Sequence, residues 1–365
     1  MADDWHLIDQ LLLLLHKNNG SDLIIKTGDR IRMKMDGRVV TIPAEKMAPP
    51  THDQVVEMIK HLIRKLPHPP TVEGAHNIDC QYSLENVSHY RIHVMATARS
   101  FGIVARRIPQ EIPNFEQLRL PPVLGEIADN RNGLILIGGA TGSGKSTTLS
   151  AMLYRVIQRR PVHVVTLEDP IEFRYPFDCP GTVTQREVGT DLESYEQGLN
   201  DCLREAPDII LAGEIRDKSV IQMALMAAET GHLVAATVHA TTAVGTIQRM
   251  MGAFAAEEQD AFIERMAESL RAIVVQKLLP CKEGKGRTAV MEILIVNAVI
   301  RQFLLDWSDK AQEIPRALEE GHRIYGTQSF DQHLQMLVED NSISYEDAYI
   351  NAVFPEDFEM RMGRN

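Results

Sequence analysis

The sequence is poor in the residues that disulfide-stabilised, zinc-binding and nucleic-acid-binding proteins need. Its 365 residues include four cysteines, and no two of them form a C-x-x-C pair. This spacing predicts neither a disulfide framework nor a zinc ribbon, and it fits a reducing compartment. Aromatic residues make up 5% of the chain, and the formal net charge is −12. Because a nucleic-acid channel takes basic walls and stacking rings, we expect no nucleic-acid partner.

Long apolar runs are also missing. The start of the chain is apolar only from Leu11 to Leu15, and Asp3 and Asp4 stand where a secretory signal would carry positive charge. A membrane span needs about 20 apolar residues, so we expect this run to belong to a core helix. A hydrophobic content of 44% over 365 residues is enough for two domains of ordinary size.

Two different patterns of predicted elements follow one another along the chain. Residues 1–115 combine strand-like runs, including a hairpin signal at Asp36-Gly37, with amphipathic helices, which predicts a small α+β domain. Four prolines in residues 109–122 predict an extended linker at its end. Residues 116–365 alternate short apolar runs with helical stretches, as in a parallel sheet covered on both faces. The predicted fold class is therefore α/β, with a domain boundary near residue 115.

The stretch GATGSGKST fills the pattern G-x-x-x-x-G-K-[ST] between a strand-like run and a helical run. Its glycines permit backbone conformations in which successive N–H groups point at phosphate oxygens. We expect Lys145 to pair with the β- and γ-phosphates and the Ser146 hydroxyl to bind Mg²⁺. The residues predicted to bind ATP are Gly139, Ala140, Thr141, Gly142, Ser143, Gly144, Lys145, Ser146 and Thr147.

Carboxylates follow two further strand-like runs. Glu214 ends PDIILAGE, where a carboxylate can polarise an attacking water, so it is the candidate general base. The alternative is that Glu214 caps the helix expected to begin near Asp217. Glu168 and Asp169 end VVTLED, and either could hold Mg²⁺ through water. A simple turn before a proline is the alternative there.

Two histidines flank the strand-like run LVAATV. His232 precedes it and His239 follows it, so their side chains point to opposite faces of an uninterrupted strand. His239 stands nearer to the expected nucleotide edge and is a candidate sensor of phosphate. A structural role is the alternative for both residues.

Taken together, the motifs resemble the PilT/PilU family of type IV pilus retraction ATPases, in the secretion ATPase superfamily. They occur in the order GATGSGKSTTLSAM, TLEDPIEF, TQREVGTD, LREAPDIILAGEIRD, TGHLVAATVHA and GTIQRMM, and the resemblance covers nearly the whole chain. It implies a PAS-like N-terminal domain followed by a RecA-like ATPase domain with a helical C-terminal portion. It also implies a cytoplasmic hexameric ring that lies against the inner membrane through an inner-membrane pilus platform protein.

The resemblance implies that ATP hydrolysis with Mg²⁺ powers pilus retraction. Arginines of the small domain are expected to contact the nucleotide, with His93 standing where a further arginine is common. The catalytic residues implied in this way are Glu168, Glu214, His232 and His239, together with Arg91, Arg99 and Arg106.

Two departures bear on the branch of the family. The assembly and type II secretion ATPases carry a four-cysteine zinc module, whereas this chain has one cysteine in the matching stretch LLPCKEG, which favours retraction. The stretch REVGTD and the long C-terminal end resemble PilU, so an accessory, nucleotide-gated subunit beside a paralogous retraction ATPase is one alternative. A related secretion or conjugation ATPase is the other. We expect the acidic residues 339–359 to form a surface helix.

Overall fold

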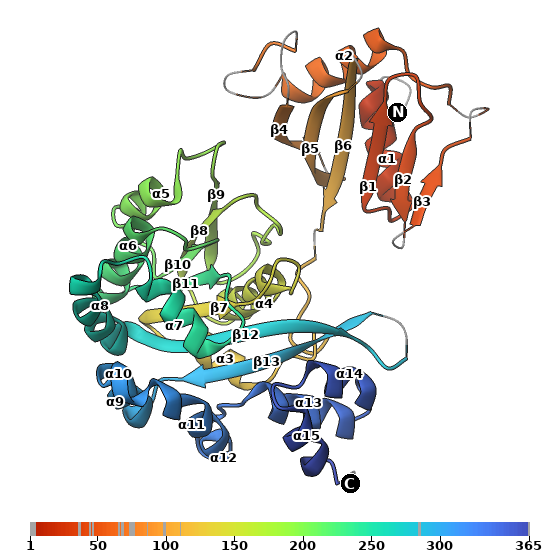
Figure 1. The fold of residues 1–365 in the computed structure, drawn as a ribbon. Coiled ribbons are helices and arrows are strands. Elements are labelled where there is room, and N and C mark those ends of the chain that lie inside the picture. Colours follow the sequence, from red (N-terminus) through yellow and green to blue (C-terminus); the bar gives the residue numbers. More distant parts are fainter. Residues whose placement is uncertain are drawn as a thin grey trace. The chain divides into compact units, whose positions relative to one another are not determined.

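The chain folds as two compact units, residues 1–111 with 172–174 and residues 112–171 with 175–365 (Figure 1). The expected hairpin turn Asp36-Gly37 and the candidate Arg99 lie outside the residues that the structure describes. The computed structural model describes residues 5–35, 38–43, 45, 47–64, 66, 69–72, 77–85, 87–97, 100–109, 111–283 and 286–363.

The first unit is a six-stranded antiparallel sheet with two helices packed against it. The strands follow the order β3-β2-β1-β6-β5-β4. Buried and exposed residues alternate along β4, so one face of the sheet meets the helices and the other faces solvent. The elements are α1 (Leu7–Lys17), β1 (Asp22–Lys26), β2 (Arg32–Met35), β3 (Arg38–Thr41), α2 (His52–Ile63), β4 (Asn77–Leu84), β5 (Ser88–Thr97) and β6 (Ser100–Ile108).

The second unit is built on a seven-stranded sheet of order β13-β12-β7-β11-β10-β8-β9. All neighbours pair in parallel except β13, which runs antiparallel to β12. β7, β10 and β11 are buried at every residue, as expected for parallel strands covered on both faces. The strands are β7 (Gly133–Gly138), β8 (His163–Glu168), β9 (Thr182–Glu187), β10 (Ile209–Ala212), β11 (Leu233–Val238), β12 (Leu270–Pro280) and β13 (Arg287–Ile295).

Helices of the second unit connect the strands and then continue as a helical C-terminal portion (Figure 1). The connecting helices are α3 (Val123–Ala128), α4 (Lys145–Ile157), α5 (Tyr195–Cys202), α6 (Lys218–Glu229), α7 (Ala243–Met251) and α8 (Ala256–Ser269). The C-terminal helices are α9 (Ala298–Leu305), α10 (Trp307–Lys310), α11 (Ile314–Glu320), α12 (His322–Tyr325), α13 (Phe330–Glu339), α14 (Tyr345–Asn351) and α15 (Pro355–Arg361). The acidic end therefore forms helices, each of which buries residues against its neighbours.

Two parts of the second unit differ from the sequence-based expectation. The hairpin β12–β13 was not expected as strands, because α8 ends at Ser269 and β12 begins at Leu270 with no turn residue between them. The linker is not simply extended: Asn114 and Gln117 exchange side-chain to backbone hydrogen bonds of 2.8 and 2.9 Å that close a turn, and α3 follows.

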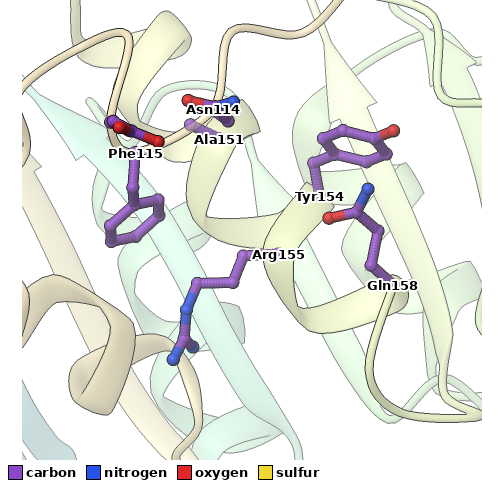
Figure 2. Close-up of a pocket in the computed structure, with 7 residues that line it drawn as sticks. Asn114, Phe115, Ala151, Tyr154, Arg155 and Gln158 are labelled. Atoms are coloured by element: carbon purple, nitrogen blue, oxygen red, sulfur yellow. The ribbon is translucent and has the colours of Figure 1, made fainter.

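The turned linker packs on α4. Together they form a pocket of about 240 Å³ lined by Asn114, Phe115 and Glu116 from the linker, by three residues of α4 and by its C-cap Gln158. Figure 2 shows Phe115 and Arg155 on the two walls of this pocket. Arg155 also binds the Asp129 carboxylate at 2.9 Å, so it joins α4 to the end of α3. The linker is thus attached to the helix that follows the phosphate loop.

His333 gives the second unit a titratable contact between α13 and β13. It is 6% exposed, and its Nδ1 accepts a hydrogen bond of 2.9 Å from the Met291 N–H. Burial lowers the pKa of His333 from 6.5 to about 4, so the folded state holds it neutral. In the unfolded chain the pKa of His333 returns to its ordinary, higher value, so the unfolded state binds a proton before the folded state does. The contribution of His333 to stability is therefore complete above that higher pKa and falls as the pH drops below it.

We predict that the unfolding free energy of the protein falls by about 2 kcal/mol between pH 7 and pH 5 because of His333. His333→Asn keeps an acceptor for the Met291 N–H but cannot titrate in this range, so this part of the pH dependence should disappear. Urea unfolding of both proteins at the two pH values measures the difference. Equal losses of stability in the two proteins would contradict the prediction.

Candidate nucleotide-binding site

Four neighbouring strands of the second unit end at the same edge of the sheet (Figure 1). β7 leads into the phosphate loop, and Val238 at the end of β11, its neighbour, leads into His239. β10 is followed by Glu214, and β8 ends at Glu168. Because these strands are parallel, the segments that follow them meet at their carboxyl ends, where such sheets bind ligands.

The phosphate loop has glycine where other residues would be strained, as Gly139 and Gly144 show. Gly139 has a φ of 146°, and a Cβ built there would lie 2.5 Å from the Gln276 carbonyl oxygen and from Ser143 Oγ. Gly144 has a φ of 86° and is the N-cap of α4. Side chains at these positions would be strained or would collide with neighbouring atoms.

Two side chains hold the loop in shape. Lys145 is buried, and its Nζ donates hydrogen bonds to the Gly139 and Ala140 carbonyls at 2.9 and 3.0 Å. Gln276 of β12 donates to the Ser143 carbonyl at 2.6 Å and accepts from Thr148 Oγ1 at 2.8 Å. Gln276 therefore ties the loop to the first turns of α4. Gln276 was not identified as a site residue from the sequence. The only sequence feature that indicates its role is a glutamine within an apolar run.

The loop fits a phosphate chain. Within the part of the chain that the structure describes, the backbone N–H groups of Gly142, Gly144, Ser146 and Thr147 have no hydrogen-bond acceptor. Ser143 Oγ is buried there and has no partner either. Successive free donors at the N-terminus of a 13-residue helix form a site for an anion.

Glu214 lies between Arg216 and His239. Its Oε2 accepts a hydrogen bond from Arg216, and its Oε1 lies 3.1 Å from His239 Nε2. Burial by itself would raise the pKa of Glu214, but Arg216, His239 and Lys145 outweigh burial and lower it below its ordinary value. The side chain thus points to the site and does not cap α6, whose N-cap is Asp217. The structure brings together Glu214 and His239, both of which were candidates.

Glu168 and Asp169 belong to the same edge. Glu168 Oε1 accepts hydrogen bonds from Thr166 Oγ1 at 2.6 Å and from Gln185 Nε2 at 3.1 Å, so neighbouring strand residues orient it. The pKa of Tyr195 is raised by burial and by the charges of Asp169, Glu214 and Glu168. These three carboxylates therefore lie around one tyrosine of α5, which the sequence did not mark.

Magnesium would have few protein ligands here. Among the described residues, no group of three or more histidine, cysteine or acidic side chains could hold a metal ion by itself. Ser146 is partly exposed in the first turn of α4, where its hydroxyl can reach a cation on a bound phosphate. Glu168 and Asp169 at the neighbouring strand end could act through water.

His232 lies at the opposite edge of the sheet. Its carbonyl accepts from Gly133 N at the start of β7, and its Nδ1 lies 2.9 Å from the Ala227 carbonyl near the end of α6. The six residues of β11 separate it from the phosphate edge by about 20 Å. The structure therefore does not bring His232 to the phosphate loop of its own chain.

The two described arginine candidates face each other in the first unit. Arg91 of β5 pairs directly with Arg106 of β6, and both are exposed. Arg106 Nε donates to Asp22 Oδ1 at 2.8 Å. Burial would raise the pKa of Asp22, but Arg106 and Ser21 lower it further than burial raises it. The side chain of Arg91 has no hydrogen bond or ion pair to any described residue. Like charges opposite each other are unfavourable, and an anion would relieve them.

None of the helices in the described ranges combines the length and the apolar character that crossing a membrane requires.

Known proteins resemble the chain over nearly its whole length. It is 37% identical to the type IV pilus retraction ATPase PilT of Pseudomonas aeruginosa, over 96% of this chain and 99% of that protein. It is 35% identical to the type IV pilus ATPase PilU of the same organism, over 94% of this chain and 88% of PilU. A crystal structure of the pilus retraction motor PilT with bound ADP matches with a TM-score of 0.86 and 31% identity, covering 97% of this chain and 99% of that one.

The X-ray structure of the Legionella pneumophila ATPase DotB matches with a TM-score of 0.81 and 28% identity, covering 98% of this chain and 96% of DotB. These likenesses confirm the resemblance and the fold class predicted from the motifs. The model of the type II/IV secretion system protein family matches residues 5–349. The chain belongs to this family of ATPases.

Proposed function

We propose that the protein is an ATP-hydrolysing motor that powers type IV pilus retraction. The observation that carries this proposal is a complete phosphate loop with the Glu214–His239 pair at the adjacent strand ends. The 37% identity to a retraction ATPase over almost the full length of both chains supports pilus retraction as the process that the motor powers.

The residues of this site can divide the work of phosphoryl transfer to water. The free N–H groups of the loop and Lys145 bind the β- and γ-phosphates, with Lys145 turning from the two carbonyls that it now contacts. Glu214 orients a water molecule whose oxygen forms a bond to the γ-phosphorus while the bond to the β,γ-bridging oxygen breaks. Its lowered pKa keeps it ionised at neutral pH, so it can accept the proton of that water. Bound Mg²⁺ would neutralise charge on the phosphates, held by Ser146 and, through water, by Glu168 or Asp169.

The arginines extend the proposal to an assembly. Arg91 and Arg106 are directly opposite each other on neighbouring strands, and two arginines on one face of a sheet suit a phosphate chain. We include Arg99 in this group from the sequence resemblance. The proposed assembly is a cytoplasmic hexameric ring in which these arginines contact nucleotide, and its partner is an inner-membrane pilus platform protein.

One observation favours a second candidate function. The chain matches PilU about as well as it matches PilT. The second candidate is therefore an accessory ATPase that turns over slowly alone and works beside a paralogous retraction ATPase.

Replacing Glu214 by glutamine should separate binding from hydrolysis. We predict that Glu214→Gln binds ATP normally and turns it over about 10² to 10⁴ times more slowly, because the amide cannot accept the proton of the water. Glu229→Gln, which removes a carboxylate that pairs with Arg265 at the far end of α6, is the control and should retain activity. Fluorescent-nucleotide binding and steady-state phosphate release measure the two steps. Normal turnover in Glu214→Gln would remove Glu214 from this role.

Adding one methyl group to the phosphate loop should weaken nucleotide binding. In Gly139→Ala the new Cβ would meet the Gln276 carbonyl and Ser143 Oγ at 2.5 Å in a strained backbone conformation. We predict that the Kd for ADP rises by about 5- to 150-fold, since strain of this kind is worth roughly 1–3 kcal/mol. Gly252→Ala, where the nearest atom would lie at 3.4 Å, is the matched control. Equal affinities of the two variants would contradict the prediction.

Turnover should depend on protein concentration if arginines from one chain complete a site on another. We predict that ATP turnover per subunit rises with concentration and reaches a plateau as the ring forms. Turnover that stays low at every concentration, with nucleotide binding intact, would favour the accessory function. In that case, addition of a PilT-type ATPase should restore motor activity. Full turnover at concentrations where only monomers exist would argue against sites shared between subunits.

A further inference from the structure

Glu292 is a buried carboxylate that is not among the candidate site residues of the sequence. It lies on β13, is 9% exposed, and its Oε1 accepts a hydrogen bond from the backbone N–H of Ala243. Ala243 is the first residue of α7, so the carboxylate binds the N-terminus of that helix. Burial raises the pKa of Glu292, although the Ala243 N–H and Lys277 act against that rise.

The register of the sheet places Glu292 in line with the phosphate edge. Glu292 pairs with Val275, Val275 pairs with Gly138, and Gly138 pairs with Val238. Gly138 is the last residue of β7 before the phosphate loop, and Val238 is the last residue of β11 before His239. One row across four strands therefore joins Glu292 to the starts of both functional segments.

The first turn of α7 packs on this row. A Cβ at Gly138 would lie 3.2 Å from Thr246 Oγ1 of α7 and 3.4 Å from the Ala240 carbonyl. Thr242 caps the helix by accepting from the Gly245 N–H at 2.9 Å. Only three residues separate His239 from Ala243. The position of the first turn of α7 thus sets where His239 can lie.

We propose that Glu292 is a positioning residue for ATP hydrolysis: it fixes the first turn of α7 and, through it, holds His239 beside Glu214. The inference rests on the proposed ATPase function of this site. β13 supplies no residue to the phosphate loop. The proposal gives this strand an indirect role in hydrolysis through Glu292.

Loss of Glu292 should affect hydrolysis more than nucleotide binding. The phosphate loop is held by Lys145 and Gln276, whose side chains bond to the loop and to Thr148 and not to the Glu292 carboxylate. Gln276 follows Val275 in β12, so its side chain points to the opposite face of the sheet, where it meets α4. The loop can therefore keep its shape while His239 moves. A displacement of about 1 Å at a catalytic contact can cost up to 100-fold in rate.

Three variants test the proposal in the full-length protein. Glu292→Met has a similar volume but cannot accept the Ala243 N–H, so kcat should fall at least about tenfold while the KM for ATP changes less than about threefold. Glu292→Gln keeps an acceptor and should retain kcat within about threefold of the wild type. Thr288→Val removes another buried polar group of β13 and should leave kcat unchanged.

A double-mutant cycle separates positioning from a general loss of stability. If Glu292 acts through His239, Glu292→Met should change kcat less than about threefold in a His239→Ala background. Independent effects that multiply in the double variant would overturn the proposal. An equal loss of kcat in Glu292→Gln and Glu292→Met would also overturn it, because the acceptor would then not be the relevant feature.

A crystal structure of Glu292→Met tests the same inference without any turnover. We expect His239 Nε2 to leave hydrogen-bonding distance of Glu214 Oε1, and an unchanged contact would overturn the proposal. A wild-type protein that binds ATP but does not hydrolyse it, even with a PilT-type ATPase present, would count against the proposed function. The crystal structure would still decide whether Glu292 positions His239.

Discussion

The parallel register between β7 and β11 is the constraint on which the rest of the site depends. Gly138 is paired with Val238, so the phosphate loop and His239 begin at the same level of the sheet. β10 and β8 continue this alignment and bring Glu214 and Glu168 to the same edge. A slip of one residue would turn the side chains of a strand to the opposite face of the sheet. Fully buried strands prevent such a slip, because their apolar side chains pack on both faces.

Candidate residues that directly follow a strand could be predicted from the sequence, because the sequence motif and the end of the strand lie in the same short segment. The phosphate loop, Glu214 and His239 were all proposed as candidates in this way, and the structure places them at one edge of the sheet with His232 at the other. Gln276 and Glu292 could not be recognised, because their partners Ser143 and Ala243 lie 133 and 49 residues away in the chain. Tyr195 has no signal at all, since only the folded sheet brings Glu168, Asp169 and Glu214 around it.

The same reasoning explains where the element prediction was incomplete. Periodicity detects α8 and the apolar residues of β12, but the chain passes from Ser269 to Leu270 without a glycine or proline to mark the change. Prolines predicted an extended linker, yet Asn114 and Gln117 form local hydrogen bonds that close a turn. Local side-chain bonds of this kind compete with regular backbone structure and are visible only when both partners are placed.

Electrostatics link the two halves of the site. Lys145 is bound to two carbonyls of its own loop, and its charge also helps to lower the pKa of Glu214. A triphosphate drawn to Lys145 brings negative charge toward the Glu214 carboxylate, and negative charge raises the pKa of a neighbouring acid. In the proposed mechanism the carboxylate would therefore become a stronger base when the phosphates are in place, while Arg216 and His239 act to keep it ionised. Because His239 Nε2 lies 3.1 Å from Glu214 Oε1, the proposed mechanism gives the groups that set the position of His239 a part in tuning the base.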